Sequence, residues 1–343
     1  MPSEALRRLP PPERFPLPPV PDGWFAVAWA ADVPAGAGVP LRAFGHDLVA
    51  FRDESGTPHV LDAHCPHLGA HLGHGGRVEG GEIRCPFHGW TFAGNGTCTR
   101  AVGARRVPKG SSQRVWPSRE LYGRLFVWHH GAGEPPQWEL PTELANPNLR
   151  WGKPSRIERT IDSHVQDVAE NAVDPLHFQY VHRQNEITAA ATRFEGHHLI
   201  TELETTSDLQ RMAGIPGFPL KAEIRVDLYG LGLQTVFTKI IEPRTGFALN
   251  TLVIEALVPV EPGVVRLDIE VRLARVRLPG ITALARATFV AAVTKDVDED
   301  IQVWVNRRFL KTPRLTPGDG PIGRYRTWAR RFYAPPAVKN ATA

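Results

Sequence analysis

Two short segments of the chain each pair a cysteine with a histidine. Cys65 and His67 stand in a C-x-H sequence, and after seventeen intervening residues Cys85 and His88 stand in a C-x-x-H sequence. This donor set suits a tetrahedral zinc ion, or a [2Fe–2S] cluster in which two histidines replace two cysteines on one iron. Either group requires a fold that brings two separate loops together at one point.

The spacing of the four donors favours the iron–sulfur cluster. Zinc sites of this composition usually place the two cysteines two to four residues apart and both histidines on a helix. Here each segment contributes one donor of each kind, and glycine and proline are frequent around both motifs. Such residues favour tight loops whose backbone N–H groups can point at cluster sulfides.

The segments CPHLGAHLG and CPFHGW closely resemble the two ligand boxes of the Rieske family. This resemblance implies that Cys65 and Cys85 bind one iron of a [2Fe–2S] cluster and that His67 and His88 bind the other. An isolated Rieske electron-transfer protein needs only the first domain, however, and would leave roughly 190 residues unexplained.

Four neighbouring residues have no matching position in these boxes. We expect His64, His71 and His74 to be hydrogen-bonding or solvent-facing groups, and Cys98 to be a small buried residue. Three cysteines are too few, and odd in number, for a secreted disulfide framework in a chain of this size. Because the N-terminal sequence also lacks the apolar centre of a secretion signal, we expect a cytoplasmic protein.

A length of 343 residues allows about two domains. Residues 1–22 contain eight prolines and few core-forming residues, so we expect an extended arm that is not part of a core. Short alternating runs between turn residues predict an all-β domain over 23–140. A polar, proline-containing connection across 138–150 leads to the second domain, 141–343.

The second domain is expected to be an α+β domain of the helix-grip kind, in which helices flank an antiparallel sheet. The sequence predicts a helix over 163–184, long strands across 194–278 and a second helix over 281–310. No apolar run is long enough to span a membrane. Basic residues (40, against 36 acidic ones) are scattered along the chain, which disfavours a nucleic-acid partner.

The first predicted helix of this domain carries the pattern E-N-x-x-D-x-x-H-x4-H, in which Glu170, Asn171, Asp174, His177 and His182 stand. Non-haem Fe(II) oxygenases hold their iron with two histidines and one carboxylate. On a regular helix a spacing of five residues separates two side chains by about 140°. Joint binding of one ion therefore requires a π-bulge or a helix end near residues 178–181.

This pattern resembles the catalytic iron motif of Rieske oxygenases, and it follows a Rieske-like domain. The resemblance implies that His177 and His182 bind a mononuclear Fe(II) and that a late aspartate in VTKDVDEDIQVW is the third ligand. Asp300 fits the register of that motif best, with Asp296 and Asp298 as rivals. The alternative for this acidic run is a solvated helix face, which suits Asp298 and Glu299 in particular.

The resemblance also implies roles for two further residues of the motif. Asp174 should connect His177 to His88 of an adjacent subunit, which implies a head-to-tail homotrimer, and Asn171 should lie beside the iron without being a firm ligand. No G-x-G-x-x-G sequence follows a predicted strand and opens a helix, so the chain lacks a nicotinamide or flavin motif. We therefore expect a ferredoxin, an NAD(P)H-dependent reductase, or both, to supply electrons.

Together the two centres imply a terminal oxygenase that hydroxylates or desaturates a C–H bond. DEDIQVWVNRRFLKTPRL and DGPIGRYRTWARRFY resemble the branch that contains 3-ketosteroid 9α-hydroxylase oxygenase components and cholesterol 7-desaturases. The desaturases carry an N-terminal membrane segment without a counterpart here, so a soluble oxygenase of steroid-like or other polycyclic hydrophobic molecules is expected. Apolar strand residues and the loop 209–219 are its candidate pocket. The alternative is the α subunit of an aromatic-ring-hydroxylating dioxygenase.

Overall fold

The structure is a computed structural model that describes residues 11–144, 146, 148–183, 187–208, 219–275 and 279–334. The chain forms two compact units. The small-sheet unit comprises Pro21–Thr142, Val258–Glu261 and Ala334–Ala343, and the large-sheet unit comprises Met1–Val20, Glu143–Leu257 and Pro262–Tyr333.

The small-sheet unit consists of short antiparallel strands in three sheets, which confirms the all-β prediction. Its core contains Phe51 and Leu61 from two neighbouring strands, and the same core includes both motif cysteines, Cys65 and Cys85. The sheets therefore fix the positions from which the two cysteine–histidine loops start. The strand orders are β1(Gly23–Trp29)–β11(Arg124–His129)–β10(Ser118–Leu121), β2(Val39–Ala43)–β3(His46–Arg52)–β4(Pro58–Asp62)–β9(Val115–Trp116) and β5(Arg77–Glu79)–β6(Glu82–Arg84)–β7(Thr91–Phe92)–β8(Cys98–Arg100), with η1(Ala30–Asp32) after β1.

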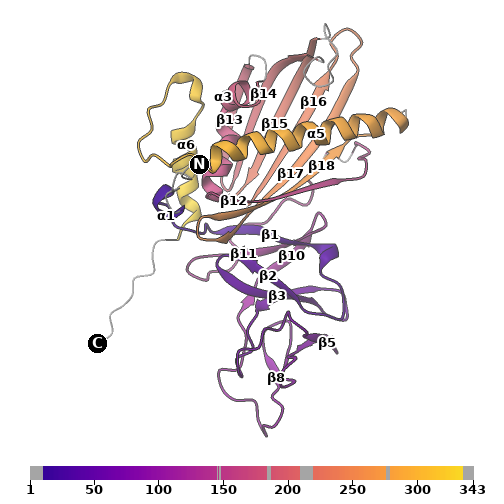
Figure 1. The fold of residues 1–343 in the computed structure, drawn as a ribbon, viewed down its shortest axis with the longest axis vertical. Coiled ribbons are helices and arrows are strands. Elements are labelled where there is room, and N and C mark those ends of the chain that lie inside the picture. The colour runs from indigo at the N-terminus through magenta and orange to yellow at the C-terminus, as the bar shows by residue number, and fades with distance from the viewer. Residues whose placement is uncertain are drawn as a thin grey trace, which may run out of the picture. The chain divides into compact units, whose positions relative to one another are not determined.

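The large-sheet unit is built on one seven-stranded antiparallel sheet (Figure 1). Five of its strands fall in the predicted β region, whereas the two strands at the edges of the sheet lie in segments with no predicted strand. One of them, β12, alternates buried Ile157 and Ile161 with exposed charged residues, as expected for a strand with one face in the core. The strand order is β12(Ser155–Asp162)–β18(Val264–Leu273)–β17(Ala248–Glu261)–β16(Leu233–Ile241)–β15(Pro219–Tyr229)–β14(His198–Asp208)–β13(Ile187–Glu195).

The prediction of one continuous helix over 163–184 is wrong. The segment forms α2 (Val165–Ala169), η2 (Glu170–Val173) and α3 (Pro175–Tyr180), with Asp174 in an extended conformation between the last two. Proline disfavours a helical conformation at the residue before it, so Pro175 breaks the helix at Asp174. The same proline then occupies the first turn of α3, where its missing N–H costs no hydrogen bond.

The long C-terminal helix α5 (Pro279–Trp304) crosses one face of the large sheet (Figure 1). Its predicted end at Leu310 is six residues too late. After Trp304 the chain leaves the helix, and Arg307 forms an ion pair with Glu170 on η2. Three short helices follow and complete this end of the core, namely η3(Pro317–Asp319), α6(Ile322–Ala329) and η4(Arg330–Phe332).

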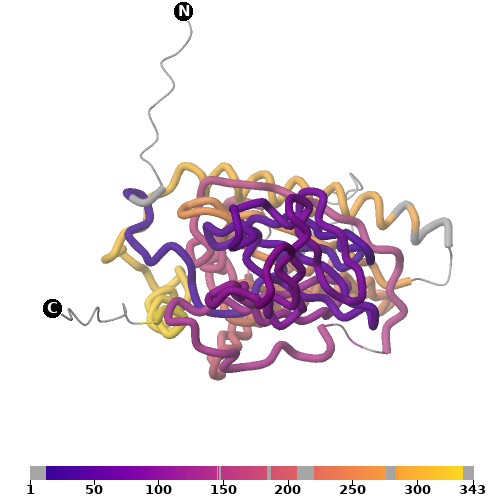
Figure 2. Tube along the Cα trace, turned by 90° about the horizontal axis from the view of Figure 1, so that it is seen from below, coloured from indigo at the N-terminus to yellow at the C-terminus, as the bar shows by residue number. Residues whose placement is uncertain are grey.

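The expectation that the proline-rich arm stays outside a core is wrong for its described part. This part begins with the short helix α1 (Pro11–Arg14), and Phe15 is only 3% exposed. Arg14 donates to the backbone oxygens of Asp162 and Val305, and its own carbonyl accepts from Phe309. Figures 1 and 2 both show α1 beside the segment that follows α5. The aromatic ring and the buried guanidinium group, which a proline count does not detect, anchor this part of the arm.

Across the described ranges, no helix combines the length and the apolar character needed to cross a bilayer.

Candidate metal centres

Two loops of the same design carry the cysteine–histidine motifs. The Gly69 N–H donates to the carbonyl of Cys65 at 2.9 Å, and the Gly89 N–H donates to the carbonyl of Cys85 at 3.1 Å. Both glycines have positive φ angles, 76° and 69°, which residues with a Cβ atom rarely adopt. Each loop therefore closes tightly on its cysteine and turns the intervening histidine in a fixed direction.

The two loops bring like donors together. The rings of His67 and His88 lie 4.7 Å apart between centroids, and Trp90 stacks on His67 at 4.6 Å. Cys65 and Cys85 are both buried. Burial, together with the neighbouring Cys85, raises the pKa of the Cys65 thiol to about 11. The pair of thiols and the pair of imidazoles thus match the two ends of a Rieske cluster.

The donor atoms fit such a cluster chemically. Nδ1 of His67 is buried and has no hydrogen-bond partner among the described residues. A buried imidazole nitrogen without a partner is unfavourable in an apoprotein, and a metal bond would satisfy it. A cationic metal also stabilises the thiolate form of Cys65, which burial disfavours.

The neighbouring residues behave as expected from the sequence. The His64 ring contacts the carbonyl of Gly69 at 3.0 Å, and Nδ1 of His71 accepts from the backbone of Gly73 at 3.0 Å. His74 is exposed, and Cys98 is buried. These four predictions are confirmed.

In the large-sheet unit, Asp174 positions His177 in two ways. The Asp174 carboxylate caps α3 by accepting a hydrogen bond from the backbone N–H of His177 at 3.3 Å. In addition, the Asp174 carbonyl oxygen lies in hydrogen-bond contact with Nδ1 of His177. Because a carbonyl only accepts, Nδ1 must carry the hydrogen, which leaves the Nε2 lone pair of His177 free for a metal.

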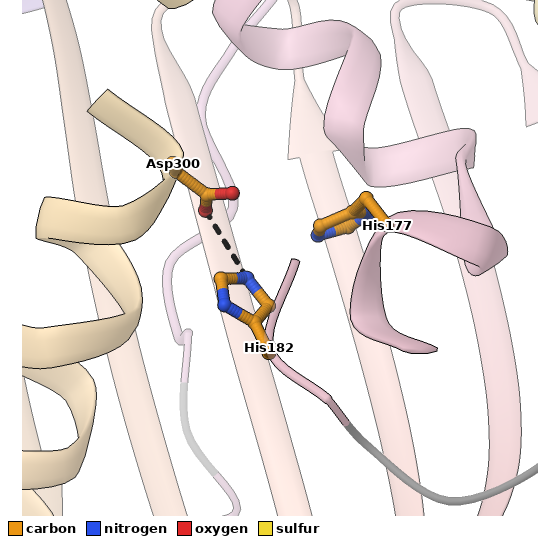
Figure 3. Close-up of side chains that lie close together, drawn as sticks. All are labelled: His177, His182 and Asp300. Carbon is orange, nitrogen blue, oxygen red and sulfur yellow. Dashed lines mark ion pairs between the residues drawn. The ribbon is translucent and has the colours of Figure 1, made fainter. Parts of the chain in front are cut away.

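His182 joins His177 because the helix ends between them. α3 stops at Tyr180, and the His182 N–H points to the carbonyl of His177 at 3.3 Å. This confirms the predicted helix end near residues 178–181. Asp300 approaches from α5, and its Oδ2 lies 3.3 Å from Nε2 of His182 (Figure 3). One ligand atom from each of His177, His182 and Asp300 lies within 4.8 Å of the other two.

The electrostatics of this triad favour a cation. Burial lowers the pKa of His177, which keeps its imidazole neutral and able to bind a metal. Burial also acts to lower the pKa of His182, but the surrounding carboxylates, above all that of Asp300, raise it above its usual value. Two imidazoles and one carboxylate on one side of an open space are the donor set of non-haem Fe(II) oxygenases.

The other acidic residues of this run do not approach both histidines. Asp298 pairs with Arg159 at 2.9 Å, away from both histidines. Asp296 and Glu299 lie 3.7 and 3.6 Å from Nδ1 of His182, which is its other ring nitrogen. That second group contains one histidine only, and its acidic side chains are more exposed than Asp300. Of these acidic residues, Asp300 alone approaches both histidines.

The triad opens into a cavity of about 620 Å³ between the sheet and α5. This volume is in the range of sites for drug-sized ligands. Asn171 lines the cavity, as expected for a residue beside the metal, and its Oδ1 lies 3.4 Å from Nε1 of Trp304. The strand part of the predicted pocket belongs to its wall, whereas residues 209–218 lie outside the described residues. The apolar lining of the cavity includes Ala222, Ile224, Val226, Val236, Val253, Leu257, Leu267, Ile269, Phe289, Val293 and Val297.

Glu170, for which the sequence indicated no role, supports the segment that carries the triad. Its carboxylate forms ion pairs with Arg326 at 2.6 Å and with Arg307 at 2.8 Å, and Arg307 also pairs with Asp167. Burial raises the pKa of Asp167 to about 6. These charges connect η2 and α2 to the chain that follows α5, so they hold both parts of the triad in one framework.

Two polar residues of the cavity wall were not among the predicted site residues. Gln234 on β16 and Glu255 on β17 are paired on neighbouring strands, and Gln234 Nε2 donates to Glu255 Oε2 at 2.8 Å. Burial, followed by the charge of Asp300, raises the pKa of Glu255 to about 7. The sequence feature that could have identified Glu255 is its position as the single acidic residue of the apolar strand sequence TLVIEALVPV. Alternation along a strand places it on the same face as Val253 and Leu257.

Comparison with known proteins identifies both parts of the chain. The model of the Rieske [2Fe–2S] domain matches residues 23–110, and the model of the 3-ketosteroid 9alpha-hydroxylase C-terminal domain matches residues 127–333. A crystal structure of dicamba monooxygenase bound to 3,6 dichlorosalicylic acid superimposes with a TM-score of 0.68, covering 91% of this chain and 96% of that one. With 16% sequence identity, it shows a common fold.

Two curated relatives align over nearly the whole chain. A probable 3-ketosteroid-9-alpha-monooxygenase oxygenase component of Rhodococcus rhodochrous is 32% identical over 339 residues, which cover 94% of this chain and 81% of the relative. A cholesterol 7-desaturase of Bombyx mori is 31% identical over 331 residues, which cover 92% and 70%. The chain therefore belongs to the Rieske oxygenases with a 3-ketosteroid 9α-hydroxylase C-terminal domain, and it is the oxygenase component of such an enzyme.

Proposed function

We propose that this oxygenase hydroxylates or desaturates a C–H bond of a steroid-like polycyclic molecule. The observation that carries the proposal is the His177–His182–Asp300 triad at the wall of a largely apolar cavity of about 620 Å³. The relatives named after 3-ketosteroids and cholesterol support the same substrate class. A rigid hydrocarbon gains affinity mainly by burying apolar surface, which this lining provides.

In this proposal Cys65 and Cys85 hold one iron of the Rieske cluster and His67 and His88 hold the other. The mononuclear Fe(II) is held by the triad, with Asp300 as the carboxylate ligand instead of Asp296 or Asp298. When bound, these groups supply electron storage and O₂ activation, so that one C–H bond, O₂, two electrons and two protons give an alcohol and water.

The residues around the triad prepare this chemistry. The Asp174 carbonyl fixes the His177 ring with its Nε2 atom free, and Asn171 occupies the wall beside the triad. The apolar strands exclude water from the substrate side, which protects a reactive site from unproductive turnover. Asp174 and Asn171 thus serve the reaction without being metal ligands.

Electrons must reach the triad from outside the chain. We assign the external donor as a ferredoxin, an NAD(P)H-dependent reductase, or both, because no G-x-G-x-x-G in the sequence follows a strand and opens a helix, as a nicotinamide or flavin motif does. In a head-to-tail homotrimer, Asp174 would connect His177 to His88 of the partner subunit. A reducing compartment such as the cytoplasm suits three cysteines that are all free of disulfides.

The test is a single turnover of the purified full chain. The protein is loaded with iron, reduced without oxygen, mixed with a steroid, and then exposed to O₂. We expect mass spectrometry to find a product that has gained one oxygen atom or lost two hydrogen atoms. An Asp300→Ala variant that retains the cluster should give no product. Oxidation of a planar aromatic acid, with every steroid left unchanged, would contradict the proposed substrate class.

A further inference from the structure

A hydrogen-bonded pair of polar side chains interrupts the apolar floor of the cavity. Gln234 and Glu255 are direct neighbours on β16 and β17, and both line the cavity. The next cavity-facing pair along the same two strands is Val236 with Val253. Leu257 follows Glu255 on the other side. A polar pair enclosed in this way is costly unless its hydrogen-bonding capacity is used.

Part of the hydrogen-bonding capacity of this pair has no partner among the described residues. Gln234 donates through Nε2 to Glu255, but its Oε1 atom is buried and has no hydrogen-bond partner among the described residues. Gln234 as a whole is only 9% exposed. Nε2 is the donor of this hydrogen bond, so the amide turns its N–H toward Glu255, and its oxygen is left for another donor. The unsatisfied atom is therefore an acceptor at the cavity wall.

The pair lies at the metal end of the cavity. The charges of Asp300 and His182 both act on the Glu255 carboxyl, so all three belong to one electrostatic neighbourhood. Further along the cavity the lining continues on β16 with Thr238 and Ile240, and neither β16 nor β17 contributes another carboxylate to it. A ligand group that binds the pair is thus held close to the position where the reaction takes place.

We propose that Gln234 and Glu255 bind a hydroxyl group of the substrate, so that the enzyme prefers a hydroxylated steroid-like molecule to the corresponding ketone. This inference rests on the proposed function and names the substrate class more closely. A hydroxyl donates to the free oxygen of Gln234 and can accept from water or from the amide in return. A ketone has no hydrogen to donate, so it leaves the Gln234 oxygen unsatisfied.

The test uses three ligands that differ at one position. Androstanol carries a single hydroxyl group, androstanone carries a ketone in its place, and androstane carries neither. Their dissociation constants are measured by equilibrium dialysis of radiolabelled ligand, with the iron-loaded full chain and without any electron donor, so that no turnover occurs. One buried hydrogen bond corresponds to a preference of about tenfold for androstanol over androstanone.

Three variants assign the preference to the pair. Gln234→Met keeps the length of the side chain without its polar atoms, and it should reduce the preference to about one. Glu255→Gln, which keeps the shape but lets the amide of Gln234 turn, should lower it as well and serves if the first variant does not fold. Thr238→Val, on the same strand and the same cavity wall, is the matched control and should retain the wild-type ratio.

Each outcome decides the inference. Equal binding of the alcohol and the ketone, tighter binding of the ketone, or an unchanged ratio in Gln234→Met and Glu255→Gln would overturn it while leaving the steroid class intact. If none of the three compounds binds, the steroid class of the proposed function fails, and this inference fails with it.

Discussion

Asp174 contacts His177 through both its side chain and its backbone carbonyl. The carboxylate accepts from the His177 backbone N–H at 3.3 Å, and the carbonyl oxygen contacts Nδ1 of the His177 ring. The first contact starts α3, and the second fixes which ring nitrogen faces the cavity. One residue therefore sets both the local fold and the chemical state of a candidate iron ligand, and the two tasks can be separated experimentally.

Replacing Asp174 by Asn retains a capping oxygen and the backbone carbonyl. We expect the Asp174→Asn protein to bind the cluster and the mononuclear iron normally, because neither contact that positions His177 is lost. Coupled turnover with the electron donor should fall by at least about tenfold, since the carboxylate is proposed to connect two subunits. Iron content and steady-state turnover are measured on the same sample. Normal coupled activity would refute the connecting role of Asp174.

Removing the Asp300 carboxylate tests the assignment of the third iron ligand. We expect Asp300→Ala to reduce the iron content from about three to about two per chain, with acid-labile sulfide unchanged, because only the mononuclear site loses a donor. Asp298→Asn is the matched control on the same helix, where the side chain pairs with Arg159. If Asp298→Asn lost the iron and Asp300→Ala kept it, the register of the motif would have to be shifted.

Breaking a buried ion pair should lower the unfolding free energy much more than breaking an exposed one. Glu170 is 5% exposed and pairs with Arg326 and Arg307. Glu170→Gln leaves cations without their partner and should cost about 3–5 kcal/mol of unfolding free energy. Glu202→Gln breaks the exposed pair with Arg193 on the same sheet unit and should cost less than about 1 kcal/mol. Chemical denaturation compares both variants with the wild type. A loss of unfolding free energy for Glu170→Gln as small as the one expected for Glu202→Gln would show that the Glu170 network is not important for stability.

Acid should weaken the fold through His164. Burial lowers the pKa of this histidine from 6.5 to about 4, while its ring caps α2 and contacts the carbonyl of Pro18. Below pH 6.5 the unfolded chain binds a proton that the folded chain does not bind. The stabilising contribution is therefore complete above pH 6.5 and is lost as the pH falls toward 4, by about 3 kcal/mol.

His164→Asn isolates this effect, because asparagine can also cap a helix but does not titrate. The difference in unfolding free energy between wild type and variant cancels contributions from all other groups. We expect the wild-type advantage to shrink steadily from pH 7 to pH 4 when denaturation curves are recorded at each pH. A difference independent of pH would mean that His164 is not buried in its neutral form.

The sequence predicted those features that depend on local spacing. The approach of the two cysteine–histidine loops, the approach of His177 to His182 and the helix end between these two histidines follow from residue types at fixed intervals together with the family resemblance. The long strands follow from their periodicity. The continuous helix was wrong because Pro175 acts through the residue before it, which apolar periodicity does not register. The predicted end of α5 was six residues too late, and beyond the helix Arg307 forms an ion pair with Glu170, which is 137 residues away in sequence and leaves no mark in local periodicity.

Features that depend on tertiary contacts could not be predicted. Phe15 is buried although its neighbours are prolines, because Arg14 finds backbone acceptors far along the chain. Gln234 and Glu255 look unremarkable until strand register places them face to face at the cavity wall. Strand register and long-range pairing require knowledge of which segments meet, and a single sequence does not contain this in its local patterns.

The measurement that tests the central claim most directly is the metal and acid-labile sulfide content of the anaerobically purified chain, together with an EPR spectrum of the dithionite-reduced protein. We predict about three irons and about two sulfides per chain and a Rieske-type signal, as expected for a [2Fe–2S] cluster with two histidine ligands and a separate mononuclear iron. Zinc without sulfide, and no such signal after reduction, would contradict the assignment of both centres.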